Sequence, residues 1–260
     1  MESTILFDKV IFGPVKSRRL GLSLGVNLLP VDRKICNYNC VYCECGLTRK
    51  VEQGNSGLPE AEKVNLLLRE HLKVAAAMDQ LPDSITFAGN GEPTLHPDFS
   101  DIMDATVAAR DEISPDSRIA VLSNATMAGK TEILLALKKA DLNMLKLDTA
   151  IEMTFQKLNQ PPPHFTIKNL VENLKKFEGN LIIQSLFVRG MAGGIHVDNT
   201  TFEEINAWLA LINDLRPKEV MVYTIERNTP YKNLEKIPAK TLNNIALAVE
   251  ELGIKATVYS

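Results

Sequence analysis

All four cysteines of the chain lie between Cys36 and Cys45. Cys36, Cys40 and Cys43 form a CxxxCxxC pattern, and three thiolates this close together in an irregular loop can each bind one iron of a cubane. The fourth iron of such a cluster has no protein ligand and is open to a small molecule. The spacing therefore predicts one oxygen-sensitive [4Fe–4S] cluster with a free coordination position.

Other uses of these cysteines fit the pattern less well. A structural zinc ion with Cys45 as its fourth ligand is one alternative, but zinc sites favour two ligand pairs set well apart in the sequence. Four cysteines without ligands, buried as small apolar side chains, are a second alternative. Bacterial ferredoxins space their cysteines differently, as CxxCxxCxxxCP. We leave Cys45 out of the predicted ligand set.

Polar and glycine-rich residues follow several runs that have the composition of β-strands. Because ligands of parallel α/β folds bind at the carboxyl ends of the strands, we expect these residues to face one mouth of the sheet. They are Gly89-Asn90-Gly91-Glu92, Ser123-Asn124, Asp148-Thr149, Arg189-Gly190 and Glu226-Arg227.

Short β-branched runs alternate with amphipathic stretches from about residue 24 to the end, which indicates repeated βα units and a parallel sheet. Such a sheet is either a barrel or a doubly wound open sheet. We expect strands at Leu24–Leu29, Ser84–Ala88, Arg118–Leu122, Asn143–Asp148, Leu181–Phe187 and Glu219–Thr224, with a short seventh at Lys255–Tyr259. We expect helices at Ala61–Met78, Phe99–Arg110, Lys130–Ala140, Thr166–Phe177, Thr201–Leu215 and Ala239–Leu252.

Size and composition are those of an ordinary globular protein. The 260 residues, 45% of them apolar, favour a single domain. The net charge of −3 gives no general basic field for nucleic acid or membrane. The N-terminal residues lack a signal sequence, and no apolar run is long enough to span a membrane, so we expect a cytoplasmic protein without a membrane partner.

Two motifs in order resemble the radical S-adenosylmethionine (SAM) superfamily. The first is CxxxCxxC with Tyr42 directly before the last cysteine, and the second is the Gly-Glu-Pro motif at Gly91–Pro93 after the next strand. Further segments are similar to a subgroup of small Fe–S oxidoreductases related to tRNA wyosine-base synthases. These segments are Gly13–Gly21, Ser23–Val26, Gln184–Gly190 and Val222–Pro230.

The resemblance implies a fold and a reaction. The fold is an α/β partial (β/α)6 barrel spanning residues 1–260 as one domain, with an N-terminal extension 1–23, a core of about 24–225 and a C-terminal helix and strand in 226–260. SAM would bind the open iron of the [4Fe–4S] cluster. An electron from a donor such as flavodoxin or ferredoxin would then cleave SAM and release a 5′-deoxyadenosyl radical, which removes a hydrogen atom from the substrate.

The resemblance also implies roles for residues near the cluster. Tyr42 would lie near the adenine, and the Gly89–Glu92 segment would present acceptors to the SAM ammonium group. Asp148 would contact the ribose, although an ion pair with Lys146 on the same strand face is an equal alternative. The implied SAM-binding residues are Tyr42, Gly89, Asn90, Gly91, Glu92, Ser123, Asn124, Asp148 and Gln184.

Residues at the rim are assigned to an unidentified substrate: Arg189, Tyr223, Glu226 and Arg227. We interpret Arg18 and Arg19 as a solvated basic pair. No cysteine remains for a second cluster, whereas wyosine synthases use one, and the acidic pI of about 5.9 also weighs against a tRNA substrate.

Three functions remain open at this point. The first is an enzyme acting on a small molecule or nucleoside, and the second is an activase that makes a glycyl radical on a partner protein. The third is a non-catalytic Fe–S or zinc-binding module. A small substrate would need a mouth closed by loops such as 159–164 and 227–234, whereas a protein substrate would need an open cleft.

Overall fold

The computed structural model describes residues 5–48 and 57–259, so the first four residues of the expected N-terminal extension lie outside it. Its main sheet has eight strands in the order β1-β2-β3-β4-β5-β6-β9-β11. All neighbours pair in parallel except β1 and β2. The strands are β1 (Ile11–Ser17), β2 (Gly21–Val26), β3 (Ser84–Phe87), β4 (Arg118–Ser123), β5 (Leu142–Lys146), β6 (Ile182–Leu186), β9 (Glu219–Tyr223) and β11 (Lys255–Tyr259).

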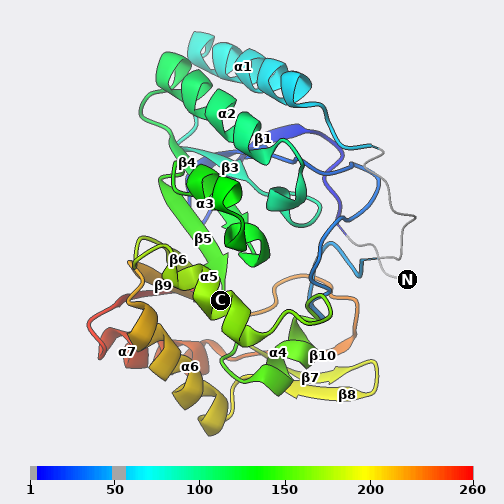
Figure 1. Cartoon of the computed structure of the whole chain (residues 1–260), viewed down its shortest axis with the longest axis vertical. Helices are drawn as coiled ribbons and strands as arrows, with labels where there is room; N and C mark the ends of the chain where they lie inside the picture. The colour runs from blue at the N-terminus through cyan, green and yellow to red at the C-terminus, as the bar shows by residue number, and fades with distance from the viewer. Residues whose placement is uncertain (1–4, 49–56, 260) are drawn as a thin grey trace.

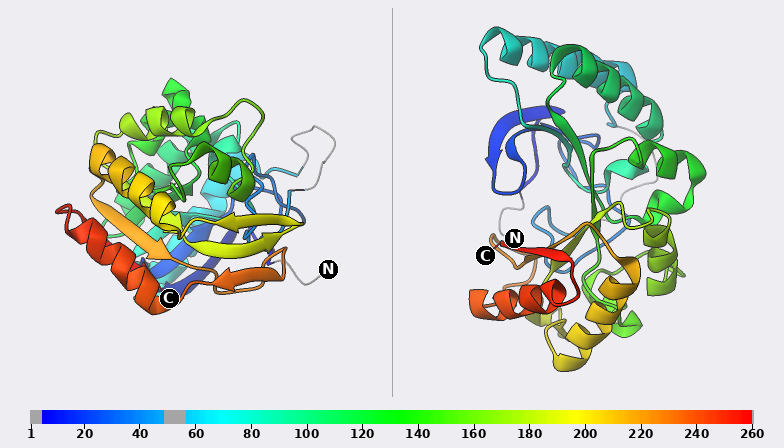
Figure 2. Two further views of the ribbon diagram at one scale, coloured as in Figure 1. Left: turned by 90° about the horizontal axis from the view of Figure 1, so that it is seen from below. Right: turned by 90° about the vertical axis from the view of Figure 1, so that its left-hand side faces the viewer.

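Seven helices in the described residues follow these strands and cover the outer face of the sheet, which curves around its inner face (Figures 1 and 2). This is the expected α/β partial barrel. None of these helices is long and apolar enough to cross a membrane. The helices are α1 (Ala61–Ala77), α2 (Phe99–Ile113), α3 (Thr131–Leu137), α4 (Glu152–Leu158), α5 (Ile167–Lys175), α6 (Phe202–Leu215) and α7 (Ala239–Glu250).

The inner face of the sheet changes from apolar to polar along the strands. A small cluster of buried apolar side chains, separate from the larger core under the helices, fills the lower part of the barrel and includes Met144, Ile182 and Met221. Side chains two positions further along a strand point to the same face. Lys146, Gln184 and Tyr223 are two residues beyond the members of that cluster on β5, β6 and β9. The polar site therefore lies directly above an apolar floor.

Four strands and one helix differ from the sequence prediction. β1 is absent from the prediction because Gly13 and Pro14 interrupt its apolar run. A separate three-stranded sheet has the order β10-β7-β8; β7 (Val188–Ala192) and β8 (Ile195–Asp198) follow β6, and β10 (Asn233–Lys236) follows β9. These strands are short, and β7 contains a glycine, so they have the composition of loops. Helix α4 likewise falls in a stretch without a predicted element.

The sheet does not close into a full barrel. The β1–β2 hairpin forms one edge and β11 forms the other, and the order of strands in the described chain contains no pairing between them. The right-hand view of Figure 2 shows the blue hairpin and the red strand on opposite sides of the opening.

Candidate active site

The cysteine loop lies across the carboxyl ends of the strands, between β2 and α1. Its four cysteines line a cavity of about 440 Å³, which is within the usual size range of small-molecule sites. The same cavity is lined by residues that follow β3 and β4, namely Gly89, Gly91, Glu92, Ser123 and Asn124. Residues from two distant parts of the chain thus meet as the sequence predicts.

Backbone hydrogen bonds attach the cysteine loop to the end of β3. The amide of Ile35 donates to the carbonyl of Asn90 at 2.9 Å, and the amide of Glu92 donates to the carbonyl of Ile35 at 3.0 Å. Gly91 lies between these two bonds at φ +136°, where a Cβ atom would be 1.8 Å from the carbonyl oxygen of Ile35. Only glycine permits this close approach of two backbones.

The other side of the loop is attached to α4. The amide of Val41 donates to the carbonyl of Leu158 at 3.0 Å, and the amide of Asn39 donates to the carbonyl of Asn159 at the same distance. Asn159 also donates from its side chain to the sulfur of Cys40 at 3.5 Å. The sequence analysis places Asn159 only in a loop that could close the mouth of the barrel, because nothing in its spacing points to a contact with a cysteine 119 residues away.

Burial and neighbouring charges make the thiols unequal. Burial raises the pKa of Cys36 to about 12 and also raises the pKa of Cys40. A hydrogen bond from Cys45 and the charge of Lys34 together lower the pKa of Cys43 to about 5, against the opposing effect of burial. Burial alone would lower the pKa of Lys34, but the cysteines nearby raise it. The loop therefore contains a buried cation that can offset the charge of bound thiolates.

The donor set fits a cluster better than a single ion. Among residues 5–48 and 57–259, no three His, Cys, Asp or Glu side chains converge closely enough to hold one metal ion. Thiolates that each bind a different iron of a cubane have no need to converge on one point. The sulfurs also lie near side-chain N–H donors, which tune Fe–S clusters, with the Asn124 amide nitrogen 3.9 Å from the sulfur of Cys36.

Glu92 organises the end of β4. Its buried carboxylate accepts hydrogen bonds from the Ser123 hydroxyl at 2.8 Å, the Asn124 amide at 2.7 Å and the Thr94 amide at 3.1 Å. Burial raises the pKa of Glu92, and these donors offset only part of the rise. The carboxylate thus fixes two of the predicted SAM-binding residues in place.

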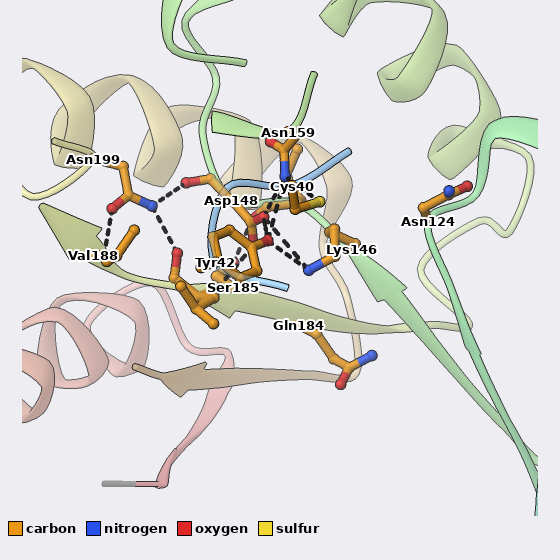
Figure 3. Close-up of polar contacts among 12 residues, drawn as sticks. Cys40, Tyr42, Asn124, Lys146, Asp148, Asn159, Gln184, Ser185, Val188 and Asn199 are labelled. Carbon is orange, nitrogen blue, oxygen red and sulfur yellow. Dashed lines mark hydrogen bonds and ion pairs between the residues drawn. The ribbon is translucent and has the colours of Figure 1, made fainter. Parts of the chain in front are cut away.

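Asp148 is surrounded by protein donors. Its side chain is fully buried, and it accepts hydrogen bonds from the Tyr42 hydroxyl, from the Asn159 amide group at 2.6 Å and from the backbone of Leu186 at 2.9 Å. Lys146 is 3.5 Å away, so the ion pair named as an alternative is present. Figure 3 shows this group beside Cys40. Asp148 is not one of the residues that line the cavity.

Tyr42 connects this group to the cavity. Its hydroxyl donates to Asp148 and accepts a hydrogen bond from Lys146 at 2.8 Å, and the same lysine nitrogen lies 5.0 Å from the centre of the ring. Tyr42 is itself a lining residue of the cavity. The position of its ring is therefore set by two buried charges of opposite sign.

Besides Asp148, two other predicted residues lie outside the cavity lining. Asn90 is fully buried, and its amide nitrogen donates to the carbonyls of Phe7 and Pro30, so it braces the loop that follows β2. Arg189 belongs to β7 and pairs with Glu235 on β10 at 2.8 Å, outside the cavity lining.

The remaining predicted residues do line the cavity. Gln184 and Tyr223 extend from the inner face of the sheet, while Glu226 and Arg227 lie at the rim. The rim residues form ion pairs, with Arg227 3.1 Å from Glu44 and Glu226 3.6 Å from Arg18. Both arginines line the cavity; Arg18 is exposed as expected, but the interpretation of Arg19 as a solvated residue is wrong, because Arg19 is partly buried.

The model of the Radical SAM superfamily matches residues 33–209, more than half of the chain. A protein named GTPase Obg from Brachyspira hyodysenteriae is 30% identical over 243 residues, which are 92% of this chain and 32% of that protein. A UPF0026 protein from Helicobacter pylori is 28% identical over 227 residues, covering 86% of this chain and 68% of its own length. The chain thus spans about a third of the Brachyspira protein.

Solved structures with the same fold are far more distant in sequence. SuiB from Streptococcus suis, bound to S-adenosylmethionine, superposes with a TM-score of 0.64 at 15% identity, over 90% of this chain and 50% of that one. Archaeal TYW1 superposes with a TM-score of 0.54 at 12% identity, over 88% of this chain and 71% of that one.

Proposed function

Because the chain belongs to the radical SAM superfamily, we propose that Cys36, Cys40 and Cys43 hold a [4Fe–4S] cluster and that SAM binds beside it in the cavity. Together these cofactors supply the one-electron cleavage of SAM and the 5′-deoxyadenosyl radical that removes hydrogen from a substrate. The observation that carries the proposal is the meeting of the cysteine loop with Gly89, Gly91 and Asn124 around one cavity.

The cavity residues would position SAM. The glycines at Gly89 and Gly91 leave backbone groups open to the ligand, and Glu92 holds Ser123 and Asn124 at the end of β4. Gln184 presents its side chain from β6 on the same inner face. Tyr42 would contact the adenine with a ring that is already fixed.

Asp148 would act mainly as a positioning residue. It holds Tyr42 and Asn159, and Asn159 in turn donates to the sulfur of Cys40. The predicted contact of Asp148 with the ribose would require it to give up one of these protein partners. We therefore propose that its effect on SAM is transmitted through Tyr42.

The substrate that fits this site best is a small molecule or nucleoside. The lining comes from the inner face of the sheet and from rim residues such as Tyr223 and Arg227, which enclose a volume of small-molecule size. The electron would come from a donor such as flavodoxin or ferredoxin.

Anaerobic reconstitution tests the proposal. The protein should bind about four irons and four sulfides, and after reduction with dithionite it should convert SAM into 5′-deoxyadenosine and methionine. Cys40→Ala should lose both cluster and product, whereas Cys45→Ala should keep the iron count. A full, reducible cluster with bound SAM that forms no 5′-deoxyadenosine, alone or with small-molecule, nucleoside, tRNA or partner-protein candidates, would favour a non-catalytic Fe–S module. Loss of the cluster in Cys45→Ala would overturn the ligand assignment.

A further inference from the structure

Arg19 extends across the open side of the barrel. It belongs to the turn between β1 and β2, and its guanidinium donates a hydrogen bond of 2.6 Å to the side-chain oxygen of Gln184 on β6. The same group lies 5.6 Å from the ring centre of Tyr223 and 6.0 Å from that of Tyr259. Arg19 thus reaches from one edge of the sheet to three strands on the other side.

The guanidinium is held in one orientation. Gln184 donates from its amide nitrogen to the carbonyl of Met144 at 2.9 Å, so its oxygen must face Arg19. The rings of Tyr223 and Tyr259 add cation–π attraction. A group fixed in this way loses little conformational entropy when a ligand binds to it.

Arg19 has no acidic partner among the described residues. Its neighbours differ, because Arg18 pairs with Glu226 at 3.6 Å and Arg227 pairs with Glu44 at 3.1 Å. A guanidinium carries five N–H donors, and within the described part of the chain Gln184 accepts from one nitrogen only. A partly buried positive charge without a counter-ion is costly, and an anion in the cavity would remove that cost.

We propose that Arg19 binds an oxyanion, either a carboxylate or a phosphate group, of a small-molecule substrate. Arginine suits this role because its planar fork matches both groups with two parallel hydrogen bonds. Two further cations line the cavity, but Lys146 is already paired with Asp148 at 3.5 Å, and Lys34 donates to the carbonyl of Gly46 at 2.9 Å beside the cysteines. The side chains below Arg19 form the apolar cluster around Met144 and Met221, which cannot pair with a charge. A charged group of the substrate would therefore find its partner in Arg19. The inference rests on the proposed function, since the cavity is also the site proposed for SAM.

Side-chain NMR of the reconstituted protein with labelled arginine tests this inference without turnover. With SAM bound, inorganic phosphate and acetate are added separately at constant ionic strength, and the Nε–H signal of Arg19 is followed. At least one anion should shift the signal saturably. Isothermal titration calorimetry, which needs no arginine signal, should show that Arg19→Gln binds the anion about tenfold or more weakly than the wild type, the usual loss for a charged hydrogen bond. Arg19→Lys should retain part of the affinity.

Arg118→Gln is the control, because it removes the same charge from an exposed position at the start of β4, outside the cavity lining. It should change the affinity for the anion by less than about twofold, since exposed charges contribute little. Equal anion binding by the wild type and Arg19→Gln would overturn the inference and leave Arg19 as a structural contact between the sheet edges. The Arg19 signal could also shift when SAM is added and then not respond to either anion. That result would overturn the inference and assign Arg19 to the SAM carboxylate. Anion binding by a protein whose reduced cluster and bound SAM form no 5′-deoxyadenosine, alone or with any of the substrate candidates above, would refute the proposed function instead.

Discussion

At the scale of single residues, the pair Lys146 and Asp148 is the main buried charge interaction of the site. The sequence places both on one strand face, and the structure shows that Tyr42 and Asn159 complete the group. Removing one member of such a pair leaves the other charge buried and uncompensated. The pair should therefore affect stability as well as ligand binding.

Asp148→Asn should lower the free energy of unfolding by about 3 kcal/mol, because Lys146 then lacks its counter-ion. The double variant Lys146→Met with Asp148→Asn should recover part of this loss. Urea unfolding of the apoprotein measures both. A loss of less than about 0.5 kcal/mol in the single variant would mean that solvent already screens the lysine. SAM affinity, measured on folded variants, should fall in Asp148→Ala by roughly 1–3 kcal/mol.

Glu92 gives a dependence on pH. Because burial raises its pKa in the folded protein, its protonated form is favoured by folding. Relative to Glu92→Gln, the wild-type apoprotein should gain stability as the pH falls through the raised pKa, with the gain complete below the ordinary value of about 4.3. That stability is lost again as the pH rises. Urea unfolding of both proteins from about pH 7 to pH 4 measures the difference, and a flat difference would contradict the assignment.

At the scale of elements, the contact between the cysteine loop and the end of β3 depends on Gly91. Gly91→Ala should destabilise the protein by at least about 2 kcal/mol, because it adds a backbone collision to the cost of a positive φ. Gly194→Ala is the control, since Gly194 has φ +85° but nothing within 4 Å of its added Cβ. Similar losses in the two variants, measured by urea unfolding, would show that the collision is relieved at little cost. Iron content after reconstitution should fall in Gly91→Ala only.

Elements with a strong local pattern were predictable from the sequence. The parallel strands are buried on both faces, so β3 and β4 appear as apolar, β-branched runs that single sequences reveal well. The three-stranded sheet was not predictable, because Gly190, Gly193 and Gly194 give this part of the chain the composition of a loop. Because the prediction lacked strand β7, it placed Arg189 at the mouth of the barrel, whereas β7 positions this residue outside the cavity lining.

The site residues divide in the same way. The cysteines and Gly91 belong to motifs whose spacing is local, and the structure brings them together around one cavity. Arg19 and Asn159 reach the site through contacts with residues 165 and 119 positions away. A single sequence contains no signal for such pairs, because a positive or an amide side chain near a turn is usually solvated.

At the scale of the whole molecule, the cysteine loop joins parts of the chain that are far apart in sequence. It is bonded to the end of β3 on one side and to α4 on the other. A ligand that binds the folded loop alone must stabilise the entire fold. Cluster loading should therefore raise the free energy of unfolding, by about 2–3 kcal/mol for a ligand at roughly a hundred times its Kd.

Anaerobic urea unfolding of reconstituted and apo protein measures this gain. Cys40→Ala should show none after the same treatment, and Cys45→Ala should show the full gain. Identical unfolding curves for loaded and apo wild type would indicate that the loop opens independently of the rest of the fold.

The unpaired edges of the main sheet affect how large a substrate can be. In the described chain the hairpin strand β1 and the last strand β11 are not hydrogen-bonded to each other. Within that part of the chain, no continuous ring of strand-to-strand hydrogen bonds therefore fixes the width of the barrel. The gap between the two edges can widen without breaking any strand pairing. The hydrogen bond between Arg19 and Gln184 spans this aperture. The upper limit on substrate size is therefore set by side chains such as Arg19 rather than by backbone hydrogen bonds between the edges.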